Sequence, residues 1–252
     1  MILSVCLNSI TGDMSRTDAM RLSKKIGYKA VEFWEGSDFP VSEYKEVLEE
    51  TGLELAAMGG SGGLTDPADR GAFLENLHKS FENAKILGAK SMIATTGWNE
   101  NPNIPREAKH ESIIAGLIEA AKILKGTDYY LVLEPLNTLV NHAGYYLDRS
   151  DEGFDIVRAV NSPNIKLLFD IYHQQIIEGN LIANITANID LIGHFHVAGN
   201  PGRHEPFYGE INYYEVFDAI KKAGYTRYAG LEYWARGDLD IEASLKKCLE
   251  MC

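Results

Sequence analysis

Long hydrophobic runs are missing from this 252-residue sequence. A membrane-spanning helix needs about 18 to 20 consecutive apolar residues, and no such stretch occurs, so we expect no membrane partner. The first residues, Met1-Ile-Leu-Ser-Val-Cys6, are apolar but lack the basic segment and the small-residue cleavage site of a secretory signal. They predict a first strand instead.

The sequence also has few basic residues compared with acidic ones. The chain carries 24 Lys and Arg against 36 Asp and Glu, a formal net charge of −12. Such a surface repels phosphate backbones, so we expect no nucleic-acid partner, and an anionic substrate would need a local cation. The three cysteines, Cys6, Cys248 and Cys252, do not form a disulfide framework, which favours reduced thiols and a cytoplasmic protein.

What the sequence does contain is a regular alternation of short, β-rich apolar runs and longer segments with helical periodicity. The eight strand candidates are residues 2–8, 30–34, 53–58, 91–95, 129–134, 165–170, 191–197 and 228–233. Gly27, Gly52, Gly88 and Gly224 each follow a helical pattern and precede a strand, as helix-ending glycines do. Eight β-α units without a linker predict one domain, residues 1–252, folded as a single (β/α)8 TIM barrel. The alternative, a doubly wound open sheet, is disfavoured because residues 8–12 do not form a G-x-G-x-x-G loop.

Polar residues stand at the ends of the last four strand candidates, namely Glu134, Asp170, His196 and Glu232. The C-terminal strand ends of a barrel surround one point, where active sites lie. Three inward carboxylates would repel one another unless a cation neutralised them. We therefore predict one divalent metal ion, Mn²⁺, Mg²⁺, Co²⁺ or Zn²⁺, bound by these four residues. The alternative is that they form ion pairs at the ends of the strands and cap the N-termini of the helices that follow.

Several motifs in the second half of the chain resemble the hydroxypyruvate isomerase family, within the xylose-isomerase-like barrel superfamily that also contains ketose 3-epimerases. The motifs are Leu133-Glu-Pro-Leu-Asn137, Phe169-Asp-Ile-Tyr-His-Gln174, Ile192-Gly-His-Phe-His196, Asn200-Pro-Gly-Arg-His-Glu-Pro206, Gly209-Glu-Ile-Asn-Tyr213 and Gly230-Leu-Glu-Tyr233. The resemblance is weaker before residue 129, where Val31-Glu-Phe-Trp34 and Gly52-Leu-Glu-Leu55 look like early strands of the family.

The resemblance implies roles for matching residues. Glu134 and Glu232 look like the paired metal-binding carboxylates that also donate and accept the proton, and Asp170 and residue 196 look like the other two ligands. His173 and Arg203 look like residues that contact the substrate. The chain departs from the family at two places. His196 replaces the glutamine usual in hydroxypyruvate isomerases and matches the ketose 3-epimerases, and Gly199 stands where an aspartate is common.

The function that the resemblance implies is a metal-dependent isomerase that interconverts a small 2-oxo acid and its aldehyde isomer, of the hydroxypyruvate and tartronate semialdehyde type, through an enediolate. A ketose 3-epimerase of the D-tagatose or D-psicose type is the alternative, because it uses the same carboxylates. Arg203 favours the acid, since a guanidinium binds a carboxylate through two parallel hydrogen bonds. The alternative for Arg203 is an ion pair with Glu205 in its own loop.

The remaining histidines and aromatic residues give weaker signals. Trp34 and His194 are further candidates for substrate contact, with Trp98 and Tyr233 as pocket walls. The alternative for His194 is a place with His204 in a layer that supports the site. We expect the three histidines outside the motifs, His78, His110 and His142, to lie on the surface. Other functions that share the barrel are a DNA-repair endonuclease, a polyol dehydratase and a non-catalytic sugar-binding subunit. An endonuclease would need more histidine ligands and a basic face. The sequence leaves open whether the chain forms a homo-oligomer.

Overall fold

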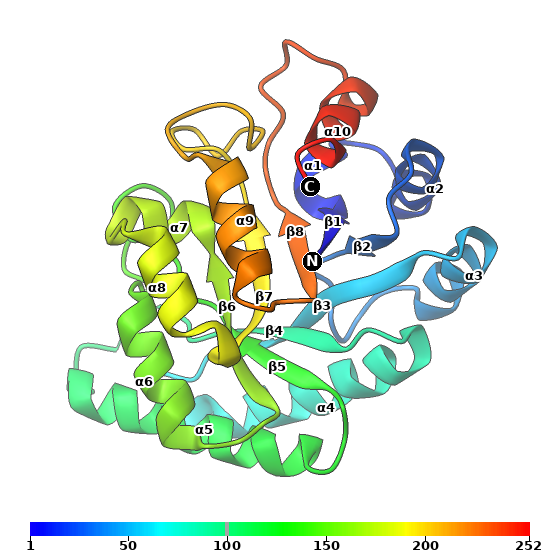
Figure 1. The fold of residues 1–252 in the computed structure, drawn as a ribbon. Coiled ribbons are helices and arrows are strands. Elements are labelled where there is room, and N and C mark those ends of the chain that lie inside the picture. The colour runs from blue at the N-terminus through cyan, green and yellow to red at the C-terminus, as the bar shows by residue number, and fades with distance from the viewer. Residues whose placement is uncertain (99–100) are drawn as a thin grey trace.

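The computed structural model describes residues 1–98 and 101–252, and within them eight central strands are surrounded by helices (Figure 1). The strands are β1 Ile2–Cys6, β2 Ala30–Glu32, β3 Glu54–Gly62, β4 Ser91–Thr95, β5 Tyr130–Leu133, β6 Ile165–Asp170, β7 Ile192–Val197 and β8 Tyr228–Leu231. All neighbours pair in parallel and in chain order, and β8 pairs with β1 to close the ring. The predicted (β/α)8 TIM barrel is confirmed.

Helices follow the strands and cover the outside of the barrel. They are α1 Leu7–Ile10, α2 Arg16–Ile26, α3 Val41–Thr51, η1 Pro67–Asp69, α4 Arg70–Leu87, α5 Arg106–Leu124, α6 Ser150–Val160, α7 Ile171–Ile177, α8 Leu181–Ala187, η2 Ile189–Leu191, α9 Tyr213–Lys222 and α10 Ile241–Leu249. Gly27, Gly52 and Gly88 end their helices with positive φ, as predicted. Across the described part of the chain, no helix is both long and apolar enough to cross a membrane.

The predicted strand ends were wrong at several places. The first strand stops at Cys6, and residues 7–10 form the short helix α1. Glu134 and Glu232 lie one residue beyond β5 and β8. Their backbone N–H groups still continue the ladder, since Glu134 donates to Ala94 (3.0 Å) and Glu232 to Val197 (3.0 Å). The carboxylates are therefore held by sheet-like hydrogen bonding although the strands have formally ended.

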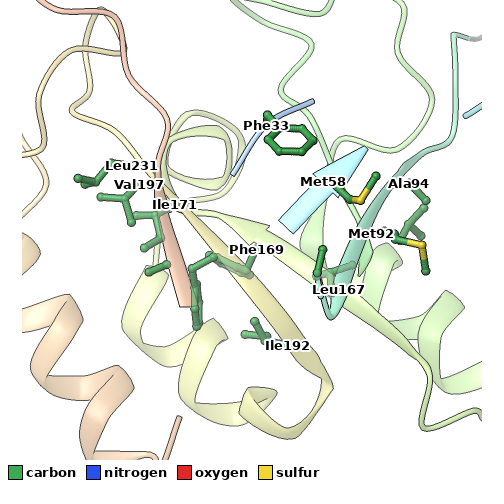
Figure 2. Packing of buried hydrophobic residues seen from close by; sticks show 14 of the residues in the cluster. Phe33, Met58, Met92, Ala94, Leu167, Phe169, Ile171, Ile192, Val197 and Leu231 are labelled. Atoms are coloured by element: carbon green, nitrogen blue, oxygen red, sulfur yellow. The ribbon is translucent and has the colours of Figure 1, made fainter. Parts of the chain in front are cut away.

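The apolar core lies between the barrel wall and the helices. Figure 2 shows Leu167 and Phe169 of β6, Ile192 of β7 and Leu231 of β8 among these buried side chains. Phe154 of α6 stacks on Phe169 at 6.3 Å between ring centroids, which fastens the helix to its strand. Burying one such large apolar side chain stabilises the fold by about 1.5–3 kcal/mol.

Polar side chains occupy part of the barrel interior, whereas the core between the barrel wall and the helices is apolar. Ser4, Glu32 and His194 are all 0–1% exposed. The strand register aligns Asp170 with His196 and His196 with Gly230. Because alternate residues of a strand face the same side, this register brings the polar ends of β6, β7 and β8 to one level at the C-terminal mouth.

Candidate active site

Four polar side chains meet at the C-terminal mouth of the barrel. Glu134, Asp170, His196 and Glu232 each offer one ligand atom, and these four atoms lie within 4.8 Å of one another. His196 Nδ1 lies 3.1 Å from Glu134 Oε1 and 3.0 Å from Glu232 Oε2. The structure thus brings together the four residues that the strand ends predicted.

This donor set fits a divalent cation. Nδ1 of His196 is surrounded by three carboxylate groups, including Asp170 Oδ2 at 4.0 Å, but an imidazole nitrogen carries one proton at most. Buried carboxylates that face one another need a positive charge between them. Three carboxylate oxygens and one imidazole nitrogen suit Mn²⁺, Mg²⁺, Co²⁺ or Zn²⁺.

The two glutamates of the cluster have pKa values that lie far apart. Burial raises the pKa of Glu134 to about 7, against the lowering effect of His196. Burial acts in the same direction on Glu232, but His196 and Arg203 lower its pKa to about 2. At a pH between these two values Glu134 carries a proton, whereas Glu232 is ionised and can accept one. The arrangement is suited to general acid–base chemistry.

Arg203 closes one side of the cluster. Its Nη2 donates to Asp170 Oδ2 at 3.1 Å and also to Glu232 Oε2. The guanidinium lies over the rings of Tyr172 (5.2 Å) and Trp234 (5.1 Å) and is largely buried. The alternative ion pair of Arg203 with Glu205 was wrong. The Glu205 carboxylate binds other groups, the backbone N–H of Arg236 and the hydroxyl of Ser244.

Glu205 is fully buried, and its carboxylate bonds to residues that follow β8. Its Oε1 accepts a hydrogen bond from Ser244 Oγ at 3.0 Å, and its Oε2 accepts one from the backbone N–H of Arg236 at 3.2 Å. These contacts link the loop after β7 to the start of α10. They leave the guanidinium of Arg203 directed at the cluster.

His173 stands beside the cluster with a defined tautomer. Its Nδ1 accepts a hydrogen bond from the backbone N–H of Asn137 at 3.2 Å, so the proton of the neutral ring lies on Nε2. Nε2 is 3.5 Å from Asp170 Oδ2. Burial and the nearby Arg203 hold the pKa of His173 well below its ordinary value. The ring is a neutral donor that lines the cavity.

The two carboxylate oxygens of Asp170 have different partners, and one of them caps a helix. Its Oδ1 accepts a hydrogen bond from the backbone N–H of His173 at 2.9 Å, at the start of α7. Its Oδ2 faces Arg203 and His196. The alternative of helix-capping ion pairs therefore describes one oxygen of Asp170, while the other remains in the cluster.

A second polar group lies deeper in the barrel and consists of Glu32, His194 and His196. Burial alone would raise the pKa of Glu32, but His194 and His196 hold it well below its ordinary value. The prediction that His194 contacts substrate was wrong. His194 is fully buried, its Nε2 lies 3.0 Å from Glu32 Oε2, and it does not line the cavity. Strand alternation places it one layer below His196.

A cavity of about 480 Å³ opens above the cluster. Among the residues that line it are Trp34, Trp98, Glu134, His142, His173, His196, Arg203 and Glu232. Trp34 donates from Nε1 to Glu232 Oε1 at 2.8 Å. The prediction that Tyr233 forms a wall was wrong, because Tyr233 is fully buried and its hydroxyl bonds to Ser244 Oγ at 2.7 Å.

Two further polar residues, His142 and Ser61, line this cavity and were not expected there from the sequence. His142 was expected on the surface, but it lines the cavity and packs edge-on against His173 at 5.1 Å between ring centroids. Ser61 belongs to the glycine-rich end of β3 that forms the opposite lining. His142 Nε2 and Ser61 Oγ are buried and have no hydrogen-bond partner among the described residues. The run Gly59-Gly-Ser-Gly-Gly63 at a strand end was the available signal, since such runs let a ligand approach the backbone.

The other histidines lie outside the cavity. His78 is exposed, as expected. His110 is half-buried and its Nδ1 lies 3.1 Å from Glu152 Oε1. His204 Nδ1 lies 2.9 Å from the backbone oxygen of Trp234, so it supports the loop that presents Arg203.

Comparison with known proteins connects this geometry to a family. The family profile described as "Xylose isomerase-like TIM barrel" matches residues 20–251. The putative hydroxypyruvate isomerase of Homo sapiens is 33% identical over 87% of this chain and 84% of its own length. The 2-oxo-tetronate isomerase of Cupriavidus necator is 31% identical over 83% of this chain and 84% of its own length.

Solved structures agree on the fold. A crystal structure described as AP endonuclease, family 2, from Brucella melitensis is 27% identical with a TM-score of 0.91, covering 97% of both chains. D-psicose 3-epimerase from Clostridium cellulolyticum H10, solved with D-tagatose, is 18% identical with a TM-score of 0.85, covering 99% of this chain and 97% of the other. The chain therefore belongs to the xylose isomerase-like TIM barrel family, with the hydroxypyruvate isomerases as relatives, and is an isomerase.

Proposed function

We propose that the protein is a metal-dependent isomerase that interconverts a small 2-oxo acid and its aldehyde isomer. The observation that carries the proposal is the pair of buried carboxylates, Glu134 and Glu232, that meet at His196 Nδ1 at 3.1 and 3.0 Å. An isomerisation of this type moves one proton between neighbouring carbons, and such a pair supplies both an acceptor and a donor.

The metal ion would be held by Glu134, Asp170, His196 and Glu232. When bound, it would polarise the carbonyl and hydroxyl oxygens of the substrate and acidify the C–H bond between them. The two glutamates would keep their second task of moving the proton.

In the reaction we propose, hydroxypyruvate loses a proton from its hydroxymethyl carbon to one glutamate. The electron pair of that C–H bond forms the carbon–carbon double bond of an enediolate. The π electrons of the carbonyl move to its oxygen. The former carbonyl carbon then receives a proton from the same glutamate or its partner, and the hydroxyl proton passes from the oxygen of the hydroxymethyl carbon to the oxygen of the former carbonyl. The product is tartronate semialdehyde, and no atom is gained or lost. His173, with its proton on Nε2, would donate to a substrate oxygen.

Arg203 supports an anionic substrate. It is a largely buried cation in the cavity of a chain with a net charge of −12. The names of the relatives, hydroxypyruvate isomerase and 2-oxo-tetronate isomerase, point to the same class of 2-oxo acid. Trp34 would hold Glu232 in place through its indole N–H and cover the substrate from one side.

The test is turnover in D₂O with Mg²⁺ or Mn²⁺ added to metal-free protein. We expect hydroxypyruvate to give tartronate semialdehyde, with deuterium entering at the carbon that receives the proton. NMR of the Mg²⁺ reaction would follow both the product and the label. Absence of turnover with every divalent metal would contradict the proposal.

A ketose 3-epimerase is the second candidate, and two observations favour it. His196 is the residue that ketose 3-epimerases carry at this position, and a cavity of about 480 Å³ has room for a substrate longer than three carbons. D-tagatose and D-psicose should therefore be assayed beside hydroxypyruvate. A higher kcat/KM for a ketose than for hydroxypyruvate would show that the substrate is a sugar and not a 2-oxo acid.

A further inference from the structure

Glu32 reaches across the interior of the barrel. It lies on β2, whereas the two histidines that it contacts lie on β7, and β1 and β8 stand between these strands in the ring. The intervening strands present small residues at this level, Ser4 on β1 and Gly230 on β8, which are paired in register. A long side chain from β2 can therefore pass to β7 because its neighbours leave the space.

Gly230 shows how closely this space is filled. A Cβ atom at position 230 would lie 2.1 Å from Glu32 Oε1 and 2.4 Å from Glu32 Cδ. Real Cβ atoms do not approach other heavy atoms that closely. The gap below Glu232 on β8 is thus occupied by the carboxylate of Glu32, and a glycine is required there.

The carboxylate of Glu32 has separate partners for its two oxygens. Oε2 accepts a hydrogen bond from Ser4 Oγ at 2.6 Å and lies 3.0 Å from His194 Nε2. Oε1 lies 3.0 Å from His196 Nε2. Within the described residues, Oε1 and His196 Nε2 have no hydrogen-bond partner, and their 3.0 Å approach is an ion-pair contact that lies outside hydrogen-bond angles.

His196 therefore faces two environments. Its Nδ1 side points to the carboxylates of Glu134 and Glu232, and its Nε2 side points to Glu32. A neutral imidazole carries one proton, and it can bind a metal only through the nitrogen that lacks this proton. In the metal-free protein Nδ1 is hydrogen-bonded to Glu134. Once a metal ion takes the Nδ1 lone pair, a carboxylate beside Nε2 would keep the remaining ring proton on that side.

We propose that Glu32 is a positioning residue that selects the tautomer and the ring orientation of His196 as a metal ligand. This inference rests on the proposed metal site. Glu32 does not line the cavity and touches no substrate, so it acts only through His196. Carboxylate partners of metal-binding histidines typically contribute about 10- to 100-fold to metal affinity.

The experiment compares Mn²⁺ and Co²⁺ binding to metal-free wild-type protein and Glu32→Gln by isothermal titration calorimetry. We expect Glu32→Gln to weaken binding by about 10- to 100-fold and to change the visible absorption spectrum of the Co²⁺ protein. Ser4→Ala is the matched control, because it removes a contact to Oε2 and leaves the Oε1 contact with His196. It should weaken metal binding by less than the roughly 10-fold expected for loss of the histidine's partner, because the Oε1 contact with His196 remains.

A double-mutant cycle separates positioning from general damage. In the His196→Gln background there is no imidazole to orient, so adding Glu32→Gln should leave metal affinity nearly unchanged. An equal loss in both backgrounds would overturn the proposal, as would unchanged affinity in Glu32→Gln alone. If Glu32→Gln does not fold, Glu32→Asp keeps the charge but is one methylene too short, and it should show the same pattern.

Three outcomes distinguish a second metal site, failure of the proposed function and failure of the positioning role. Two ions per wild-type chain, falling to one in Glu32→Gln, would make Glu32 a ligand of a second site with His194 and would overturn the positioning role. No metal binding by the wild type would overturn the proposed function and this inference together. Intact wild-type binding with an unaffected Glu32→Gln variant would overturn the inference alone.

Discussion

Arg203 donates from Nη2 to Asp170 Oδ2 at 3.1 Å, so the buried cation of the cavity is bound to a proposed metal ligand. The same nitrogen also donates to Glu232. Arg203 can therefore act in two ways: it can hold the carboxylates in place, and it can offer its remaining N–H groups to an anionic substrate. Arg203 Nε has no hydrogen-bond partner in the described residues, which leaves a donor for the second task.

Arg203→Lys should lower kcat/KM for hydroxypyruvate by about 10- to 150-fold. A lysine ammonium cannot make paired N–H contacts to a carboxylate, and one lost charge-assisted contact costs about 1.5–3 kcal/mol. Turnover of neutral ketoses should barely change. Steady-state kinetics with hydroxypyruvate and D-psicose would measure both values.

Arg236→Lys is the matched control, since Arg236 is exposed and does not line the cavity. It should behave like the wild type. An equal loss with hydroxypyruvate and D-psicose would show that Arg203 serves mainly to hold Asp170 and Glu232, and would contradict a role in acid recognition.

Glu134→Gln and Glu232→Gln should each abolish turnover of every substrate. The amide has the size of the carboxyl group but cannot transfer the proton, and losing general acid–base catalysis costs at least about 100-fold in kcat. Turnover would be measured at saturating metal, with bound metal counted by elemental analysis. Glu250→Gln, at an exposed residue of the last turn, is the control. Substantial turnover by either cluster variant would exclude that glutamate as the proton carrier.

Metal affinity should rise with pH from about pH 5 through pH 7. In the metal-free protein the pKa of Glu134 is raised to about 7, and the carboxylates hold the pKa of His196 well above its ordinary value. Both groups carry protons below pH 7, and a metal ion must displace them. Glu232, with a pKa near 2, is already ionised in this range and releases none.

We expect Mn²⁺ affinity to fall by about tenfold per pH unit, for each proton displaced, as the pH drops from 7 to 5. Calorimetry in two buffers of different ionisation enthalpy would count the released protons. A flat affinity over this range would mean that neither Glu134 nor His196 gives up a proton to the metal.

His142→Phe should lower kcat/KM for the true substrate by about 2- to 12-fold, the effect of one neutral hydrogen bond. The phenyl ring keeps the packing against His173 but lacks Nε2, which has no hydrogen-bond partner among the described residues. His78→Phe, at an exposed position, is the control. Comparing three- and four-carbon 2-oxo acids would reveal which substrate reaches His142. No change with any substrate would remove His142 from the binding site.

The protein should neither bind nor cleave nucleic acid, although one similar structure is described as an AP endonuclease. With a net charge of −12 the chain has little means to neutralise a phosphate backbone. Fluorescence polarisation with duplex DNA carrying an abasic site would test binding, and a gel would test cleavage. Salt-dependent binding at micromolar protein, or metal-dependent strand cleavage, would contradict this prediction.

The sequence alone determined the barrel and the level of the cluster, because both depend on local patterns. Eight apolar runs separated by helical segments specify parallel strands with outer helices, and the period of two along a strand decides which residues face inward. Glu134, Asp170, His196 and Glu232 could therefore be placed from their positions at strand ends. The exact ends of β5 and β8 could not, since backbone hydrogen bonds continue past the last regular residue.

Only the tertiary structure decided which side chains meet across the barrel and in the loops. Glu32 reaches His196 because Ser4 and Gly230 on the intervening strands are small, a condition that involves three other strands at once. His142 enters the cavity because the loop between β5 and α6 folds back over the barrel mouth, where the ring packs on His173. Such contacts depend on side-chain volume and on the course of loops between residues distant in sequence, and no local periodicity encodes them.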